Sequence, residues 1–153
     1  VQSFIYIHVE CMPSHNACDV RNKLLSAIYE HDGTIFLTNS DEKLFSFEKL
    51  HFHQDHIHPF SGFDTRKIKP LNLDKDKITA WQKKRNKLPN LQLLEGSSNE
   101  SKNATPLVDW LKQGHTVKYL PKEISYELAN FEEFYQKRKQ LMTEELRRIL
   151  NII

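Results

Sequence analysis

The stretch Leu50-His51-Phe52-His53-Gln54-Asp55-His56-Ile57-His58-Pro59 carries four of the chain's eight histidines. An apolar segment runs into the pair Asp55-His56, and a turn is expected at Pro59. A strand that ends in this pair would place a carboxylate, which can bind a metal ion, beside an imidazole that titrates near neutral pH. These are the two groups that metal-assisted hydrolysis of a phosphodiester requires.

The length and composition indicate a single soluble domain. With 153 residues, of which 27% are charged, 39% hydrophobic and 10% aromatic, the chain can bury one core. No apolar run approaches the roughly 20 residues of a membrane span, and no signal-peptide pattern opens the chain. Cys11 and Cys18 form neither a zinc motif nor a disulfide scaffold, so we expect a cytoplasmic protein. Because the first residue is Val1, we expect a fragment of a longer protein.

The positive charge is concentrated in one segment. The whole chain has a net charge of +2, but residues 63–87 contain nine Lys or Arg and three Asp, which gives +6 there and −4 elsewhere. The nine basic residues are Arg66, Lys67, Lys69, Lys75, Lys77, Lys83, Lys84, Arg85 and Lys87. A basic segment beside the histidine cluster indicates a polyanionic partner, and an ordinary solvated helix face is the alternative.

Periodic apolar positions and turn residues predict the order of the elements. In chain order the pattern predicts a helix over 19–31, a strand over 34–37, a helix from Asp74 that Pro89 breaks, a strand over 91–94 and short helices over 99–103 and 106–112. The clearest element is a terminal amphipathic helix, whose apolar residues recur every three or four positions from Phe131 to Leu150.

Three stretches resemble the HNH (His-Asn-His) endonuclease family. They are Asp55-His56-Ile57-His58-Pro59, Leu88-Pro89-Asn90-Leu91-Gln92-Leu93-Leu94 and Ser98-Asn99-Glu100-Ser101-Lys102-Asn103. A closer resemblance is to the C-terminal nuclease domain of modification-dependent and phosphorothioation-linked restriction proteins. There, a Pro-Leu-x-x-Trp-Leu helix and a terminal helix opening Asn-Phe-Glu-x-Phe follow the HNH core. The matching residues here are Pro106-Leu107-Val108-Asp109-Trp110-Leu111 and Asn130-Phe131-Glu132-Glu133-Phe134.

The resemblance covers residue 44 to the C-terminus and implies an α+β fold, a mainly helical domain built around a ββα-metal (HNH) core. Residues 1–43 would be a helical or irregular lead-in, 44–112 the nuclease core, and 113–153 a helical extension packed on it.

The chemistry and the resemblance together assign roles to individual residues. His56 is expected to be the general base and Asp55 an oxygen ligand of Mg²⁺, which Mn²⁺ could replace. The resemblance implies that Asn99 is the second metal ligand and that Asn90 hydrogen-bonds across the Asp-His loop to orient His56. Lys102, one turn beyond Asn99, is expected to reach a phosphate oxygen. Two protein ligands predict a site for one metal ion.

The predicted function is a metal-dependent endonuclease domain that acts on double-stranded DNA. A nucleotide-hydrolysing sensor domain would lie upstream in the full-length restriction or anti-phage protein. Contacts with backbone phosphates are expected from Lys83, Lys84, Arg85 and Lys87. The alternatives are a nucleic-acid-binding module whose HNH site is unused and an RNA-cleaving nuclease.

Other residues of the motif have weaker assignments. A turn or cap role is an equal alternative for Asn90 and for Asn103, a possible secondary site residue. His53 could contact phosphate but is expected to buttress the fold, whereas His51 and His58 are expected to be scaffold or surface residues. A zinc site made of all four histidines is excluded, because ligands within eight residues of one strand cannot surround an ion tetrahedrally.

Overall fold

A β-hairpin lies at the centre of the structure. The computed structural model describes residues 52–149, in which β1 (Phe52–His56) pairs antiparallel with β2 (Leu91–Glu95). The register sets Asp55 opposite Gln92. The Asp-His pair therefore occupies the last two positions of the first strand. The second strand confirms the one that the sequence predicts there.

The connection between the two strands is helical. In chain order it contains η1 (Phe60–Phe63), α3 (Thr65–Ile68), η2 (Lys69–Leu71), α4 (Lys75–Lys84) and η3 (Leu88–Asn90). The carboxylate of Asp74 caps α4 by accepting from the backbone N–H of Lys77 at 2.7 Å, which confirms the helix predicted from this residue. The sequence predicts neither α3 nor η2, because one turn of helix with a single buried residue, Ile68, shows no periodicity.

Two short helices follow β2. The first, α5 (Gly96–Lys102), starts directly at the end of the strand and packs against both strands. The second, α6 (Leu107–Lys112), starts after Pro106, which suits a helix start. Both confirm predicted helices, although α5 begins three residues earlier than expected. The hairpin and α5 thus form a strand–strand–helix unit.

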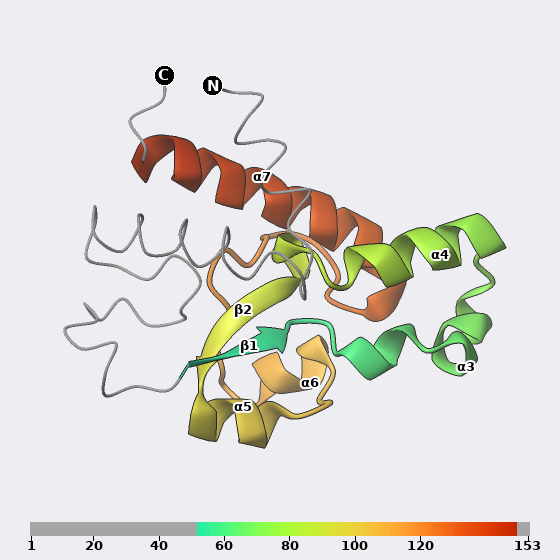
Figure 1. Ribbon diagram of the computed structural model, residues 1–153, viewed down its shortest axis with the longest axis horizontal. Helices are drawn as coiled ribbons and strands as arrows, with labels where there is room; N and C mark the ends of the chain where they lie inside the picture. The colour runs from blue at the N-terminus through green and yellow to red at the C-terminus, as the bar shows by residue number, and fades with distance from the viewer. Residues whose placement is uncertain (1–51, 150–153) are drawn as a thin grey trace.

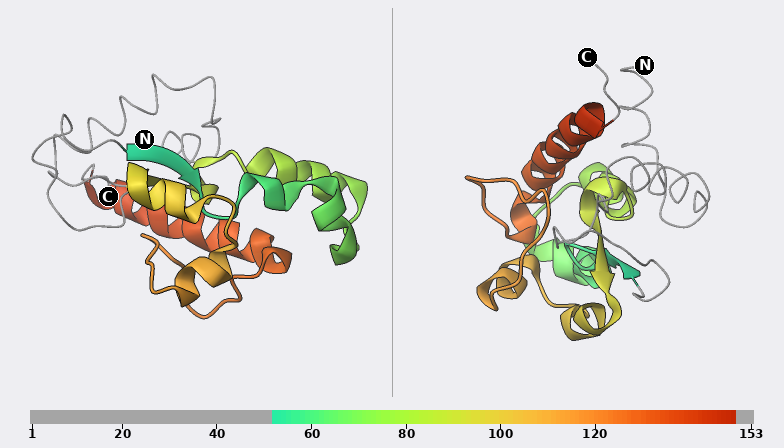
Figure 2. Two further views of the ribbon diagram at one scale, coloured as in Figure 1. Left: turned by 90° about the horizontal axis from the view of Figure 1, so that it is seen from below. Right: turned by 90° about the vertical axis from the view of Figure 1, so that its left-hand side faces the viewer.

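The long helix α7 (Phe131–Ile149) follows η4 (Leu128–Asn130) and confirms the predicted terminal helix. Figure 1 shows α7 along one side of the hairpin, with α5 and α6 on the opposite side. The right-hand view of Figure 2 also shows the hairpin between α7 above and α5 below.

One hydrophobic cluster joins the helical connection, α6 and α7. It consists of Ile57, Phe63, Ile68, Trp81, Leu107, Trp110, Val117, Phe131, Phe134 and Tyr135. The ring of Phe131 packs edge-on against Phe63 and Trp81, with centroid distances of 4.7 and 5.3 Å. Residues before and after position 112 therefore share one core.

The guanidinium of Arg138, on the inner face of α7, is fully buried. Its Nη1 donates to the carbonyl oxygens of Leu88, Pro89 and Leu91 at 3.3, 2.9 and 3.1 Å, and Nη2 donates to that of Lys118 at 3.2 Å. Burial lowers the pKa of Arg138 to about 9, so the group stays charged at neutral pH. One side chain thus fastens α7 to η3, to the start of β2 and to the segment after α6.

The described residues form a mostly helical α+β fold with a two-stranded sheet, which agrees with the predicted class. The finer assignment to an HNH core stays a prediction. The lead-in over 1–43, with its predicted helix and strand, lies outside the described residues. Within residues 52–149, no helix combines the length and the apolar character needed to cross a membrane.

Replacing Arg138 by Met should lower the free energy of unfolding by about 3 kcal/mol or more, because it removes the buried charged hydrogen bonds to several backbone carbonyls. The matched control is Lys137→Met, which removes a partly exposed ion pair with Glu133 one turn away and should cost less than about 0.5 kcal/mol. Urea denaturation followed by circular dichroism measures both. Equal losses in the two variants would contradict the role given to Arg138.

Candidate active site

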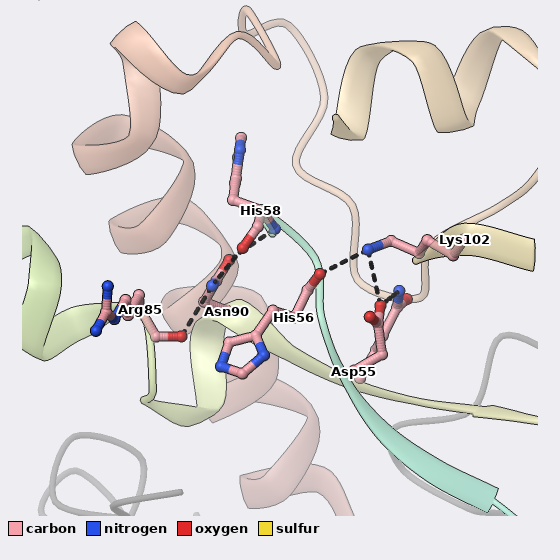
Figure 3. Close-up of polar contacts among 7 residues, drawn as sticks. Asp55, His56, His58, Arg85, Asn90 and Lys102 are labelled. Carbon is pink, nitrogen blue, oxygen red and sulfur yellow. Dashed lines mark hydrogen bonds and ion pairs between the residues drawn. The ribbon is translucent and has the colours of Figure 1, made fainter. Parts of the chain in front are cut away.

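The carboxylate of Asp55 is buried and has two donors on one oxygen. Its side chain comes from β1 and is 8% exposed. Gln92, its neighbour across the hairpin, donates from Nε2 to Oδ2 at 2.8 Å, and the Lys102 ammonium lies 2.9 Å from the same oxygen. Both contacts stabilise the negative charge of the carboxylate. They reach Asp55 from β2 and from α5, so the hairpin and the helix meet at this residue (Figure 3).

The ammonium of Lys102 points inward. The side chain is 0% exposed, and besides Asp55 it donates to the backbone carbonyl of His56 at 2.6 Å. Burial lowers the pKa of Lys102, and the adjacent Asp55 carboxylate partly offsets this. The sequence predicts a contact between this lysine and a phosphate. In the structure the ammonium instead holds the end of β1 against α5.

His56 hydrogen-bonds to a residue that sequence reasoning missed. Its Nε2 lies 2.9 Å from Oδ1 of Asn86, at the turn after α4. Because an amide oxygen can only accept, Nε2 carries the proton and Nδ1 keeps its lone pair. Burial lowers the pKa of His56, while the Asn86 hydrogen bond and the Asp55 charge partly offset this. The neutral imidazole is therefore the favoured form.

Asn90 hydrogen-bonds across the loop that follows the Asp-His pair, as the sequence predicts. It is 0% exposed, and its Oδ1 accepts from the backbone N–H of His58 at 3.0 Å. Its Nδ2 donates to the carbonyls of His58 and Arg85 at 3.1 and 2.9 Å, and its own carbonyl accepts from the N–H of Ile57 at 2.9 Å. Figure 3 shows this amide between the loop and the turn after α4. These bonds fix the path of the chain directly after His56.

A pocket of about 270 Å³ opens where Asp55 and His56 meet the end of α5. Its lining consists of Asp55, His56, Pro59, Phe60, Ser61, Asn103 and Ala104. Asn103 has a left-handed φ of 43° and donates its backbone N–H to the carbonyl of Asn99 at 3.0 Å, a geometry typical of a helix C-terminus. Asn103 therefore has the cap role given as the alternative and also lines the pocket, while its role as a secondary site residue stays a prediction.

The amide of Asn99 belongs to the face of α5 that meets the hairpin. It precedes Lys102 by three positions, and residues three apart in a helix lie on the same face. Lys102 places that face against Asp55. The side chain of Asn99 is partly buried and is not among those that line the pocket.

The basic residues at the end of α4 differ in their contacts and in their exposure to solvent. Lys84 forms an ion pair with Glu132 of α7 and lies over the ring of Tyr135 at 5.2 Å. Arg85 lies over the ring of Phe60. Lys83 is exposed and Lys87 is partly exposed. Of the predicted phosphate contacts, Lys83 is thus the one most open to solvent, whereas Lys84 is already paired with a carboxylate.

The histidines of the cluster lie in different surroundings. His58 is 2% exposed, contacts Phe131 and Phe134 edge-on, and its Nε2 has no partner. Burial, and to a lesser degree the charge of Lys102, lowers the pKa of His58 to about 3. His58 is therefore part of the scaffold. Its ring and that of His56 point to opposite sides of the chain (Figure 3).

The side chain of His53 and all of His51 lie outside the described structure. Within residues 52–149, no three or more His, Cys, Asp or Glu side chains gather as metal ligands do. A magnesium site of the predicted kind, with one carboxylate and one amide, would not form such a group. No family model matches this sequence, and no curated protein matches it significantly.

Replacing Asn86 by Ala should lower the pKa of the His56 imidazole further, because the substitution removes a hydrogen bond that raises it. Asn86→Asp should raise the pKa instead, since a carboxylate accepts the same bond and adds a negative charge. ¹⁵N NMR of the histidine rings measures both the pKa and which nitrogen carries the proton. An unchanged pKa and tautomer in both variants would show that Asn86 does not act on His56.

His58 should make the fold sensitive to acid. Its pKa is about 3 in the folded state and ordinary in the unfolded state, so only the unfolded chain takes up a proton between these values. The free energy of unfolding should therefore fall by about 2 kcal/mol from His58 alone between about pH 7 and pH 5. His58→Leu should remove this part of the pH dependence, as measured by urea denaturation at each pH. Parallel curves for the variant and the unaltered chain would refute this.

Proposed function

We propose that this chain is an HNH-type endonuclease domain that hydrolyses phosphodiester bonds in DNA with Mg²⁺, for which Mn²⁺ could substitute. The observation that carries the proposal is the shared pocket of Asp55 and His56, at the junction of a β-hairpin with a helix. A carboxylate and a neutral imidazole open to the same small space are the minimum that such chemistry needs.

His56 would act as the general base. Its Nε2–H is taken by Asn86, which leaves Nδ1 to accept a proton from an attacking water. Burial lowers the pKa of the ring, so that the proton-accepting form predominates at neutral pH. The amide of Asn90 binds the backbone of His58, two residues after the base. This would keep the imidazole of His56 at a fixed position relative to Asp55.

The donor set fits a hard divalent cation. Both described contacts of the Asp55 carboxylate go to Oδ2, and the same side chain lines the pocket. Asn99, three positions before Lys102 on α5, would supply an amide oxygen as the second ligand, the role that the resemblance implies for it, but its side chain does not line the pocket in this structure. When bound, the ion would supply positive charge to the phosphate and to the attacking water. Lys102 and Gln92 would hold the carboxylate in one orientation.

DNA would be held by its backbone. Lys83 and Lys87 offer charges near the site, and Arg85 adds a third at the rim of the pocket. The resemblance to restriction nucleases supports a cytoplasmic anti-phage role and an upstream nucleotide-hydrolysing sensor domain as further parts of the proposal.

The direct test is cleavage of supercoiled plasmid with Mg²⁺ by the unaltered chain and by His56→Ala. Loss of a general base should reduce the rate about 100-fold or more. The matched control is His115→Ala, because His115 is exposed and stacks on Trp110, away from the pocket. Its rate should stay within about threefold of the unaltered chain.

Equal cleavage by His56→Ala and the unaltered chain would overturn the assignment of the base. Cleavage that persists in a chelator would overturn the role of the metal. Folded RNA, incubated in parallel, decides between the DNA and RNA forms of the proposal.

A further inference from the structure

Phe60 is an exposed aromatic side chain at the entrance to the proposed active site. Phe60 is 46% exposed. Among the described large hydrophobic residues, the only other one with comparable exposure is Leu141 on α7, at 36%. Phe60 lines the same pocket as Asp55 and His56. A substrate group bound in this pocket would therefore lie close to the ring. A single exposed apolar residue is ordinary on a protein surface, but this one lies beside the proposed base and in the lining of its pocket.

The ring of Phe60 is held in place by two neighbours. The guanidinium carbon of Arg85 lies 3.5 Å from the ring centroid, a cation–π contact that covers one face. The ring of His56 meets it edge-on at 5.6 Å. The backbone of Arg85 is itself fixed, because its carbonyl accepts from the buried amide of Asn90. The aromatic ring and the cation are thus presented together, and 46% of the Phe60 residue surface remains exposed beside them.

We propose that Phe60 and Arg85 form a binding site for an unstacked nucleotide next to the phosphate that is cut, an inference that rests on the proposed nuclease function. An aromatic ring stacks on any base, and an adjacent guanidinium attracts the phosphate of the same nucleotide. In a regular duplex the faces of the bases are covered by their neighbours, so the ring can contact them only where the strands are open. The preferred substrate is therefore DNA with unpaired nucleotides, such as a single strand, a flap or a bulge.

The test measures binding of the full chain in the presence of a chelator, so that no cleavage takes place. Fluorescence anisotropy compares a labelled single strand of about 20 nucleotides with the same strand in a duplex. The unaltered chain should bind the single strand more tightly. Phe60→Ala should weaken single-strand binding about 10-fold, because base–aromatic stacking is worth about 1–3 kcal/mol, and should change duplex binding by less than about twofold.

Three further variants make the result specific. Phe60→Trp keeps an aromatic face and should retain the single-strand preference. Phe60→Leu keeps apolar bulk without that face and should behave like Phe60→Ala. Leu141→Ala removes the other exposed apolar side chain, away from the pocket, and should change neither affinity. Thermal unfolding of each variant, expected within a few degrees of the unaltered chain, shows that it is folded.

An unchanged single-strand affinity in Phe60→Ala, or an equal loss with both forms of DNA, would overturn the inference. Retention of the preference by Phe60→Leu would also overturn it, since the contact would then not be stacking. The assay requires no catalysis. A failure of the nuclease proposal in the plasmid assay is thus told apart from a failure of the nucleotide site.

Discussion

The buried guanidinium of Arg138 is the contact on which the geometry of the site depends. A charge removed from water is tolerated only where its donors find acceptors, and here the acceptors are backbone carbonyls. The carbonyls of Leu88, Pro89 and Leu91 belong to the short segment in which η3 passes into β2. Asn90 lies in the middle of that segment, so α7 fixes its backbone from one side.

The side chain of Asn90 connects this fixed segment to residues at the pocket. Its amide binds the backbone of His58 on one side and the carbonyl of Arg85 on the other. The first contact sets the loop that follows the proposed base. The second sets the residue whose guanidinium covers Phe60. Both the base and the aromatic rim of the pocket are thus positioned by backbone contacts of a single buried amide. Contacts to backbone atoms tolerate changes in neighbouring side chains, which leaves the rim free to vary.

The sequence predicts features that depend on local pattern. The Asp-His pair at a strand end, the second strand and the terminal helix all follow from spacing and turn residues. The bond of Asn90 across the loop followed from the resemblance and is present. The direction in which a side chain points, and the residue that it contacts, do not follow from local pattern. The residues around Lys102 in the sequence do not indicate that its ammonium is buried against Asp55. A lysine at the same position of α5 could equally point into solvent.

Two further residues illustrate the same limit. His58 stands between the buried Ile57 and the turn at Pro59, and its own burial involves two aromatic rings of α7 that lie far along the chain. Asn86 stands in a run of basic residues and belongs to no recognised motif. Its contact with His56 exists only because the turn after α4 packs against the end of β1. In both cases the deciding contact joins residues at least thirty positions apart, a separation that periodicity does not reach.

The buried pair of Asp55 and Lys102 links the chemistry of the site to the register of the hairpin. A slip of one residue in the pairing of β1 with β2 would turn every side chain of β1 to the opposite face. Asp55 would leave Lys102, whose ammonium has no access to solvent, and an unpaired buried charge costs several kcal/mol. The bonds of Gln92 to Asp55 and of Asn90 to the loop after β1 act in the same direction. The ion pair that holds the carboxylate of Asp55 therefore also stabilises the register in which Asp55 and His56 line one pocket.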